Sequence, residues 1–174
     1  ITYDVRGYVA AQTLVNFLIT AEQGMLVSQR EDTGGSLIAN ANFDTRGNAK
    51  TVERRDFVLV NGNKVFTTGS NVENIYDPAF GRGVASMTRN FAITAGEGKD
   101  IAQRLYSDGT YALGITYDER GNTLSQTLVN FVITAAQGQL DSQRQATGGS
   151  LLENLSFDVR GNALISRTRD FAID

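Results

Sequence analysis

Acidic side chains that recur at a fixed spacing are the first candidates for chemistry in this chain. "DTRGN" at Asp44, "DERGN" at Asp118 and "DVRGN" at Asp158 repeat one pattern, and "DVRGY" at Asp4 keeps its Asp, Arg and Gly. Carboxylate and amide oxygens bind Ca²⁺, but the ion takes about six to eight of them. One Asp and one Asn beside a cationic Arg supply too few. We therefore predict no metal site and interpret these Asp residues as turn formers, because Asp bonds its own backbone in turns.

Other catalytic groups are scarce. The chain has no His and no Cys, which excludes triads and dyads built on them and removes the usual zinc, copper and iron ligands. Glu31 and Asp32 form an acidic pair of the kind that glycosidases use. In the second copy of this segment they become Gln145 and Ala146. We predict no catalytic residue, no cofactor and no enzymatic activity.

The composition limits which kinds of partner the chain can bind. The net charge is −3, and 16 Lys and Arg are interspersed with 19 Asp and Glu, so no basic footprint for nucleic acid is present. No apolar run approaches the length of a membrane span. We expect no nucleic-acid partner and no membrane span, and the lack of Cys leaves the redox compartment undetermined.

The dominant feature is internal repetition. Residues 1–60 align without a gap to residues 115–174, and 36 of the 60 positions are identical. Within this, a shorter element reads aromatic-Asp-x-Arg-Gly-Asn with a Phe thirteen residues after the Asp. Its copies begin at Tyr3, Phe43, Tyr117 and Phe157, and a copy at Tyr76, "YDPAFGRG", carries one extra residue. Residues 1–114 are expected to form one superunit of three short β repeats, starting near 1, 42 and 74, and residues 115–174 the first half of a second. We expect one continuous array that is a segment of a longer one.

Residues around the motif alternate between apolar and polar, which predicts half-buried strands. A helix over residues 14–31 is the alternative, but the equivalent segment of the next repeat contains Asn61-Gly62, a signal for a type I′ hairpin turn. Further turns are predicted at "TGGS" (Thr33 and Thr147), "TGSN" (Thr68) and "SDGT" (Ser107), with about three strands per repeat, one of them a short strand such as "QLDSQRQ". The predicted fold is all-β: tandem antiparallel β-hairpins forming an elongated twisted sheet or a β-solenoid.

Two sets of structural residues follow from the repeat. The predicted turn residues are Asp4, Arg6, Gly7, Asp44, Arg46, Gly47, Asn48, Asp77, Gly81, Asp118, Arg120, Gly121, Asn122, Asp158, Arg160, Gly161 and Asn162. The predicted core ladder, buried in one layer, is Phe17, Phe57, Phe91, Phe131 and Phe171, with the motif aromatics nearby. Each motif Arg is expected to pair with a carboxylate of a neighbouring repeat.

The motifs "YDERGN" and "FDVRGN", each followed by a strand, resemble the YD repeats of bacterial RHS-type and wall-associated proteins, here with longer units. The resemblance implies a large extracellular β-repeat protein of structural type.

The predicted function is structural: a segment or subunit of an extracellular or cell-surface filament, sheath or layer. Its partner would be itself, through β pairing across the junction between Asp174 and the next Ile1. Two alternatives stay open: an adhesin-like or carbohydrate-binding repeat module, and part of an RHS-type toxin shell.

Overall fold

The computed structural model describes residues 1–19, 30–134 and 144–173. The predicted all-β class is confirmed, because the described chain forms ten strands and one three-residue 3₁₀ helix, η2 (Ile101–Gln103). The strands are β1 (Thr2–Tyr3), β2 (Val9–Ile19), β3 (Arg30–Phe43), β4 (Ala49–Val60), β5 (Asn63–Tyr76), β6 (Gly83–Ile93), β7 (Arg104–Tyr117), β8 (Thr123–Ile133), β9 (Arg144–Phe157) and β10 (Ala163–Ala172).

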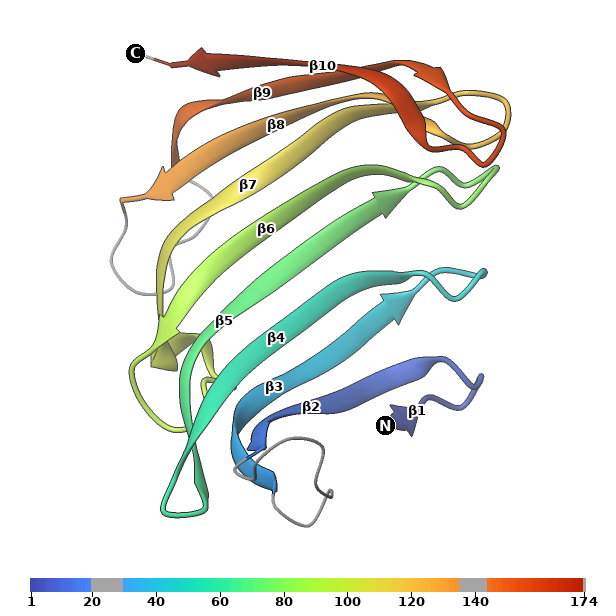
Figure 1. Ribbon diagram of the computed structural model, residues 1–174. Helices are drawn as coiled ribbons and strands as arrows, with labels where there is room; N and C mark the ends of the chain where they lie inside the picture. The colour runs from blue at the N-terminus through green and yellow to red at the C-terminus, as the bar shows by residue number, and fades with distance from the viewer. Residues whose placement is uncertain (20–29, 135–143, 174) are drawn as a thin grey trace.

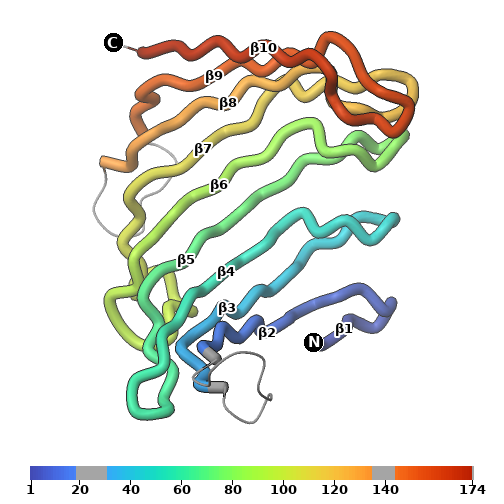
Figure 2. Tube along the Cα trace, viewed as in Figure 1, coloured from blue at the N-terminus to red at the C-terminus, as the bar shows by residue number. Residues whose placement is uncertain are grey.

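All ten strands belong to one open antiparallel sheet, in which each strand pairs with its neighbours in sequence (Figure 1). The sheet twists from β1 to β10, and the two chain ends lie at opposite ends of it (Figure 2). The five motif turns join β1 to β2, β3 to β4, β5 to β6, β7 to β8 and β9 to β10, so they line up along one side of the sheet. An antiparallel order without crossovers places every copy of the motif beside the next.

Asn-Gly makes the predicted tight turn on the other side of the sheet. Asn61 and Gly62 connect β4 to β5, and their φ values are 51° and 75°. Positive φ at both central residues defines the type I′ turn, which matches the twist of the flanking strands. The prediction of a hairpin at this position is confirmed.

The turns predicted at "TGGS", "TGSN" and "SDGT" are wrong. These residues lie inside β3, β9, β5 and β7. A β-bulge lies at the start of three of these segments and directly before the fourth: the register skips one residue at Thr33, Ser107 and Thr147, and at Thr67, which precedes "TGSN". Each bulge lies next to a motif Phe on the preceding strand. A bulge sets two residues of one strand against one of its partner and bends the strand without ending it.

The expected three strands per repeat are therefore two. The Gly-containing segment predicted as a turn is continuous with the strand that ends in the motif aromatic, giving 14-residue strands such as β5 and β7. Most of the predicted short strand "QLDSQRQ" falls within 135–143, outside the described residues, and its last two residues open β9. The helical alternative is wrong for residues 14–19, which belong to β2.

The core is a single layer on one face of the sheet. The buried apolar side chains are Phe57, Phe66, Phe91, Tyr106 and Phe131. Directly paired residues of neighbouring strands share a face, and the register places all five on the same one. We call this side the aromatic face.

Candidate functional site

The motif turns are closed by their own Asp side chains. In the second turn, Asp44 Oδ1 accepts the backbone N–H groups of Arg46 and Asn48, each at 2.8 Å. Its Oδ2 accepts the side-chain amide of Asn48 at 2.9 Å. Gly47, at φ 88°, takes the left-handed conformation that glycine adopts without steric cost. The arrangement recurs at Asp158 with Arg160 and Asn162.

These hydrogen bonds favour the ionised carboxylate. Partial desolvation raises the pKa of Asp4, Asp44 and Asp118, but the hydrogen bonds outweigh it and hold each pKa below its ordinary value. At Asp158 the amide of Asn162 is the largest cause of the lowered pKa. The oxygens of the motif carboxylates thus accept hydrogen bonds from within their own turn.

Consecutive turns stack through their glycines. A Cβ atom added at Gly47 would lie 2.5 Å from the ring of Tyr8 in the first turn, and one at Gly81 would lie 2.7 Å from Arg46 in the second. Gly121 faces Arg82 of the third turn in the same way, and Gly161 faces Asn122 of the fourth. Glycine therefore suits these positions for two reasons: it adopts the positive φ, and it leaves room for the side chain of the preceding turn.

Polar contacts also cross between turns, but they do not have the expected form. The Arg46 guanidinium donates to the carbonyl of Ala79 in the third turn. Asn48 Nδ2 donates to the Gly81 carbonyl at 3.2 Å. The expected pairing with a neighbouring carboxylate is wrong for Arg46, because each motif carboxylate is already engaged by its own turn.

The remaining motif arginines differ among themselves. Arg6, Arg120 and Arg160 are all exposed, and Arg6 pairs with Asp4 of its own turn at 3.2 Å. In the third turn, Arg82 takes up the inter-turn contact and donates to the carbonyl of Asp118 at 3.2 Å. The sequence motif alone does not separate these environments.

The aromatic residue before the Asp ties each turn to the preceding hairpin. The Tyr76 hydroxyl donates to the Ala49 carbonyl at 3.1 Å, and the Tyr117 hydroxyl to the Gly83 carbonyl at 2.5 Å. Where the motif has Phe43 instead, its ring packs on Tyr8 with centroids 5.4 Å apart. Of the other two, Tyr3 is exposed and Phe157 is half-buried.

The phenylalanine ladder is buried only in its interior. Phe57, Phe91 and Phe131 are 3%, 2% and 2% exposed, whereas Phe17 is 48% and Phe171 37% exposed. The expectation that all five would be buried is wrong for these two. Each interior Phe has a neighbouring strand on both sides, whereas among the described residues no glycine-bearing strand lies before Phe17 and no strand follows Phe171.

Each interior Phe lies across from a strand glycine. Phe57 pairs with Gly35, Phe91 with Gly69 and Phe131 with Gly109. A Cβ atom at any of these glycines would press into the aromatic ring and would also overlap a backbone carbonyl of the preceding strand. The glycines that resembled turn residues are thus sites of close strand approach.

A cation lies over each interior ring. Lys64 Nζ is 4.9 Å from the Phe57 centroid and the Arg104 guanidinium carbon is 4.7 Å from that of Phe91. Arg144 lies 5.8 Å from Phe131 and 4.5 Å from Tyr111. A cation over an aromatic face is attracted by the ring quadrupole, by about 0.5–2 kcal/mol. These cations come from the beginning of the strand that follows each Phe.

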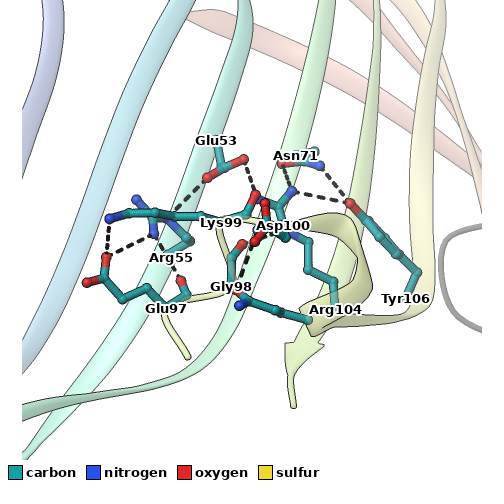
Figure 3. Close-up of polar contacts among 10 residues, drawn as sticks. Glu53, Arg55, Asn71, Glu97, Gly98, Lys99, Asp100, Arg104 and Tyr106 are labelled. Atoms are coloured by element: carbon teal, nitrogen blue, oxygen red, sulfur yellow. Dashed lines mark hydrogen bonds and ion pairs between the residues drawn. The ribbon is translucent and has the colours of Figure 1, made fainter. Parts of the chain in front are cut away.

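Arg104 organises a polar cluster on the aromatic face (Figure 3). It is 5% exposed, and its guanidinium donates to the Gly98 carbonyl at 2.6 Å, to Lys99 O at 3.0 Å and to Glu53 Oε2 at 2.7 Å. Arg55 donates to the Glu97 carbonyl at 2.9 Å. Together the two arginines hold residues 97–99 against the sheet; Arg104 lies over the ring of Phe91 and Arg55 over that of Phe66.

This arrangement offers packing and little reactive chemistry. No group of three or more His, Cys, Asp or Glu side chains able to hold a metal ion occurs among the described residues. Glu31 and Asp32 are consecutive in β3, so their side chains point to opposite faces and cannot act on one bond.

Sequence reasoning missed the cations and the purpose of the strand glycines. One signal was available: Arg30, Lys64, Arg104 and Arg144 each stand five residues before a glycine, with Thr or Ser two residues before that glycine. The spacing repeats as regularly as the turn motif, although the structure describes no side-chain position for Arg30.

No segment that the structure describes is a helix of the length and apolarity needed to cross a membrane. Comparison of the chain with protein-family models, with curated proteins and with solved structures gave no match.

Proposed function

We propose that this chain is a structural protein, a segment of an extracellular or cell-surface filament, sheath or layer assembled from tandem β-hairpin repeats. One observation carries the proposal: the residues that recur between repeats form contacts between neighbouring repeats. Gly47 and Gly81 accept the preceding turn, Arg46 bonds to the following turn, and each interior Phe packs between two neighbouring strands.

This use of the repeated residues favours architecture over catalysis. An enzyme needs one active site, so it has no use for four or five copies of the same set of side chains. An array needs the same contact at every junction, because its stability is approximately a sum of repeat and nearest-neighbour terms. The resemblance of the motif to bacterial YD repeats supports placing the array outside the cell or on its surface.

Sedimentation and negative-stain electron microscopy of the purified chain test the proposal. Fibres or sheets that grow with protein concentration, with strands spaced about 4.8 Å apart in diffraction, are the expected result. A monodisperse monomer at every concentration tested, without fibres, would contradict a filament-forming role.

A carbohydrate-binding module is the second candidate, and one observation favours it. A groove of about 380 Å³ between the second and third turns is lined by Phe43 and Tyr76, by the cations Arg6, Arg46 and Lys50 and by the carboxylates Asp44 and Asp77. Aromatic rings beside hydrogen-bonding charged groups suit a sugar ring. Calorimetry with neutral and acidic oligosaccharides checks this, comparing Lys50→Ala with Lys64→Ala, which lies outside the groove. A saturable binding heat that is lost in Lys50→Ala and kept in Lys64→Ala supports sugar binding in the groove. The absence of any binding heat excludes the tested sugars as ligands.

A further inference from the structure

The third motif turn, between β5 and β6, exposes a phenyl group (Figure 1). Phe80 is 66% exposed. It stands directly before Gly81, the positive-φ glycine of this turn. The residues at the same place in the other four turns are Arg6, Arg46, Arg120 and Arg160. An arginine there is hydrated, whereas an exposed aromatic side chain is the type that fills a pocket on a partner.

An apolar groove lies at the base of the same hairpin. Its volume is about 150 Å³, and Ile75, Ala85, Met87, Tyr111 and Leu113 line it together with Glu73. Ile75 pairs directly with Ala85, so the two side chains share a face of the sheet. Met87 lies four residues before Phe91 on β6, which places the groove on the aromatic face. Ile75 is 61% and Leu113 43% exposed, so the groove is open to solvent.

The exposed ring and the groove arise in the same hairpin. Three groove residues, Ile75, Ala85 and Met87, are apolar where both neighbouring hairpins are polar. The equivalent residues, two before the motif Asp and six and four before the ladder Phe, are Asn42, Thr51 and Glu53 in the second hairpin and Thr116, Ser125 and Thr127 in the fourth. The third hairpin thus differs from its neighbours at the turn and at the groove together, as a ring and the site that receives it would.

The size of the groove matches a phenyl ring. A cavity of about 150 Å³ lined by aliphatic and aromatic side chains holds a benzene molecule. We propose that the groove binds Phe80 of a second copy of this chain, with the two third hairpins related by a twofold axis. Each hairpin carries one ring and one groove, so a twofold axis forms the contact twice and closes the pair.

The charges beside the ring and the groove are complementary. The guanidinium carbon of Arg82 is 5.2 Å from the centroid of its own Phe80 ring, so this cation enters the interface with the ring. Glu73 pairs with Arg89, but its side chain stays 51% exposed beside the groove. Entry of Phe80 therefore brings a cation to a half-exposed carboxylate. Opposite charges placed in this way favour one register of the two copies over others.

The inference rests on the proposed structural role and specifies a lateral contact of the assembly. The contact uses a turn and the hairpin below it, in the interior of the sheet, and joins two sheets through the side on which the motif turns align.

Complementation between two variants tests the contact. Phe80→Ser removes the ring and keeps the groove, whereas Ala85→Gln fills the groove with a polar chain and keeps the ring. Val60→Ser is the control, because Val60 is 48% exposed but lies at the end of β4, on the other side of the sheet. Sedimentation equilibrium of each full chain gives the dimer dissociation constant, and circular dichroism verifies its strand content.

We expect the unmodified chain and Val60→Ser to dimerise equally, and each of the other two variants to dimerise at least tenfold more weakly. An equimolar mixture of Phe80→Ser and Ala85→Gln should associate severalfold more tightly than either variant alone. In that mixed pair, the ring of one copy meets the intact groove of the other. If Ala85→Gln loses strand content, Met87→Glu replaces it, since the second hairpin has Glu53 at this place.

A monomeric unmodified chain, a dimer that Phe80→Ser leaves unchanged, or a mixture no tighter than its components would overturn the inference. Electron microscopy of the same samples separates it from the proposed function. A dimer that Phe80→Ser abolishes, without fibres at higher concentration, keeps the contact and removes the filament role. Fibres that form equally well with Phe80→Ser keep the filament role and overturn the contact.

Discussion

The difference between interior and terminal positions of the ladder can be measured by truncating Phe131 and Phe171. Phe131 is 2% exposed, lies across from Gly109 and contacts the Tyr111 ring at 5.2 Å and Arg144 at 5.8 Å. Phe131→Ala should cost about 3–5 kcal/mol of unfolding free energy, as for a packed core aromatic.

Phe171 is the matched control, because it occupies the same position of the repeat but is 37% exposed. The additional exposure is about a third of a side chain that buries roughly 200 Å², or about 70 Å². At ~25 cal/mol per Å² this amounts to about 2 kcal/mol. Phe171→Ala should therefore destabilise the protein by about 2 kcal/mol less than Phe131→Ala.

Urea unfolding followed by far-ultraviolet circular dichroism measures both costs, provided that the slope of free energy against urea stays unchanged, since repeat arrays can lose cooperativity. Equal costs, or a larger cost at Phe171, would refute the reasoning that a following strand buries the ring. A change near zero in both variants would show that the ladder contributes nothing to folding.

The remaining predictions concern the glycines, the buried arginine and pH. Gly47→Ala should destabilise the protein by about 1–3 kcal/mol more than Gly7→Ala, because both have similar positive φ but only Gly47 faces a preceding turn, and equal losses in thermal unfolding would contradict turn stacking. Gly109→Ala should cost several-fold more than Gly83→Ala, where an added Cβ meets no atom closer than 4.0 Å, and the same denaturation experiment checks it. Arg104→Met should lower the backbone order parameters of residues 97–99 measured by NMR relaxation, since it removes the hydrogen bonds to the Gly98 and Lys99 carbonyls, and unchanged order parameters would contradict this assignment. The motif carboxylates have lowered pKa values in the folded chain, so their stabilisation is full above the unfolded pKa of about 4 and is lost as pH falls through the folded values; a thermal midpoint flat from pH 6 to pH 2 would contradict it.

Local information in the sequence was sufficient for the strands and the motif turns. Asp44 bonds the backbone two and four residues ahead, and Gly47 takes its positive φ, without help from any distant residue. Asn61-Gly62 sets its turn in the same way. Alternation of apolar and polar residues, which follows from strand geometry, gave the all-β class. These features depend on a few consecutive residues, and the same local signals recur in each repeat of the sequence.

Tertiary structure alone decided the role of the strand glycines and the burial of the ladder. Gly69 resembles a turn residue in sequence, but it lies mid-strand because the Arg54 carbonyl approaches from one neighbouring strand and the Phe91 ring from the other. Likewise Phe131 and Phe171 each stand thirteen residues after a motif Asp, and a following strand, present among the described residues for Phe131 alone, separates 2% from 37% exposure. A glycine in a turn and a glycine in a strand that a neighbouring strand approaches closely look alike in the sequence, because both lack a Cβ atom. The two cases differ only in which atoms from other strands of the sheet come close to the glycine.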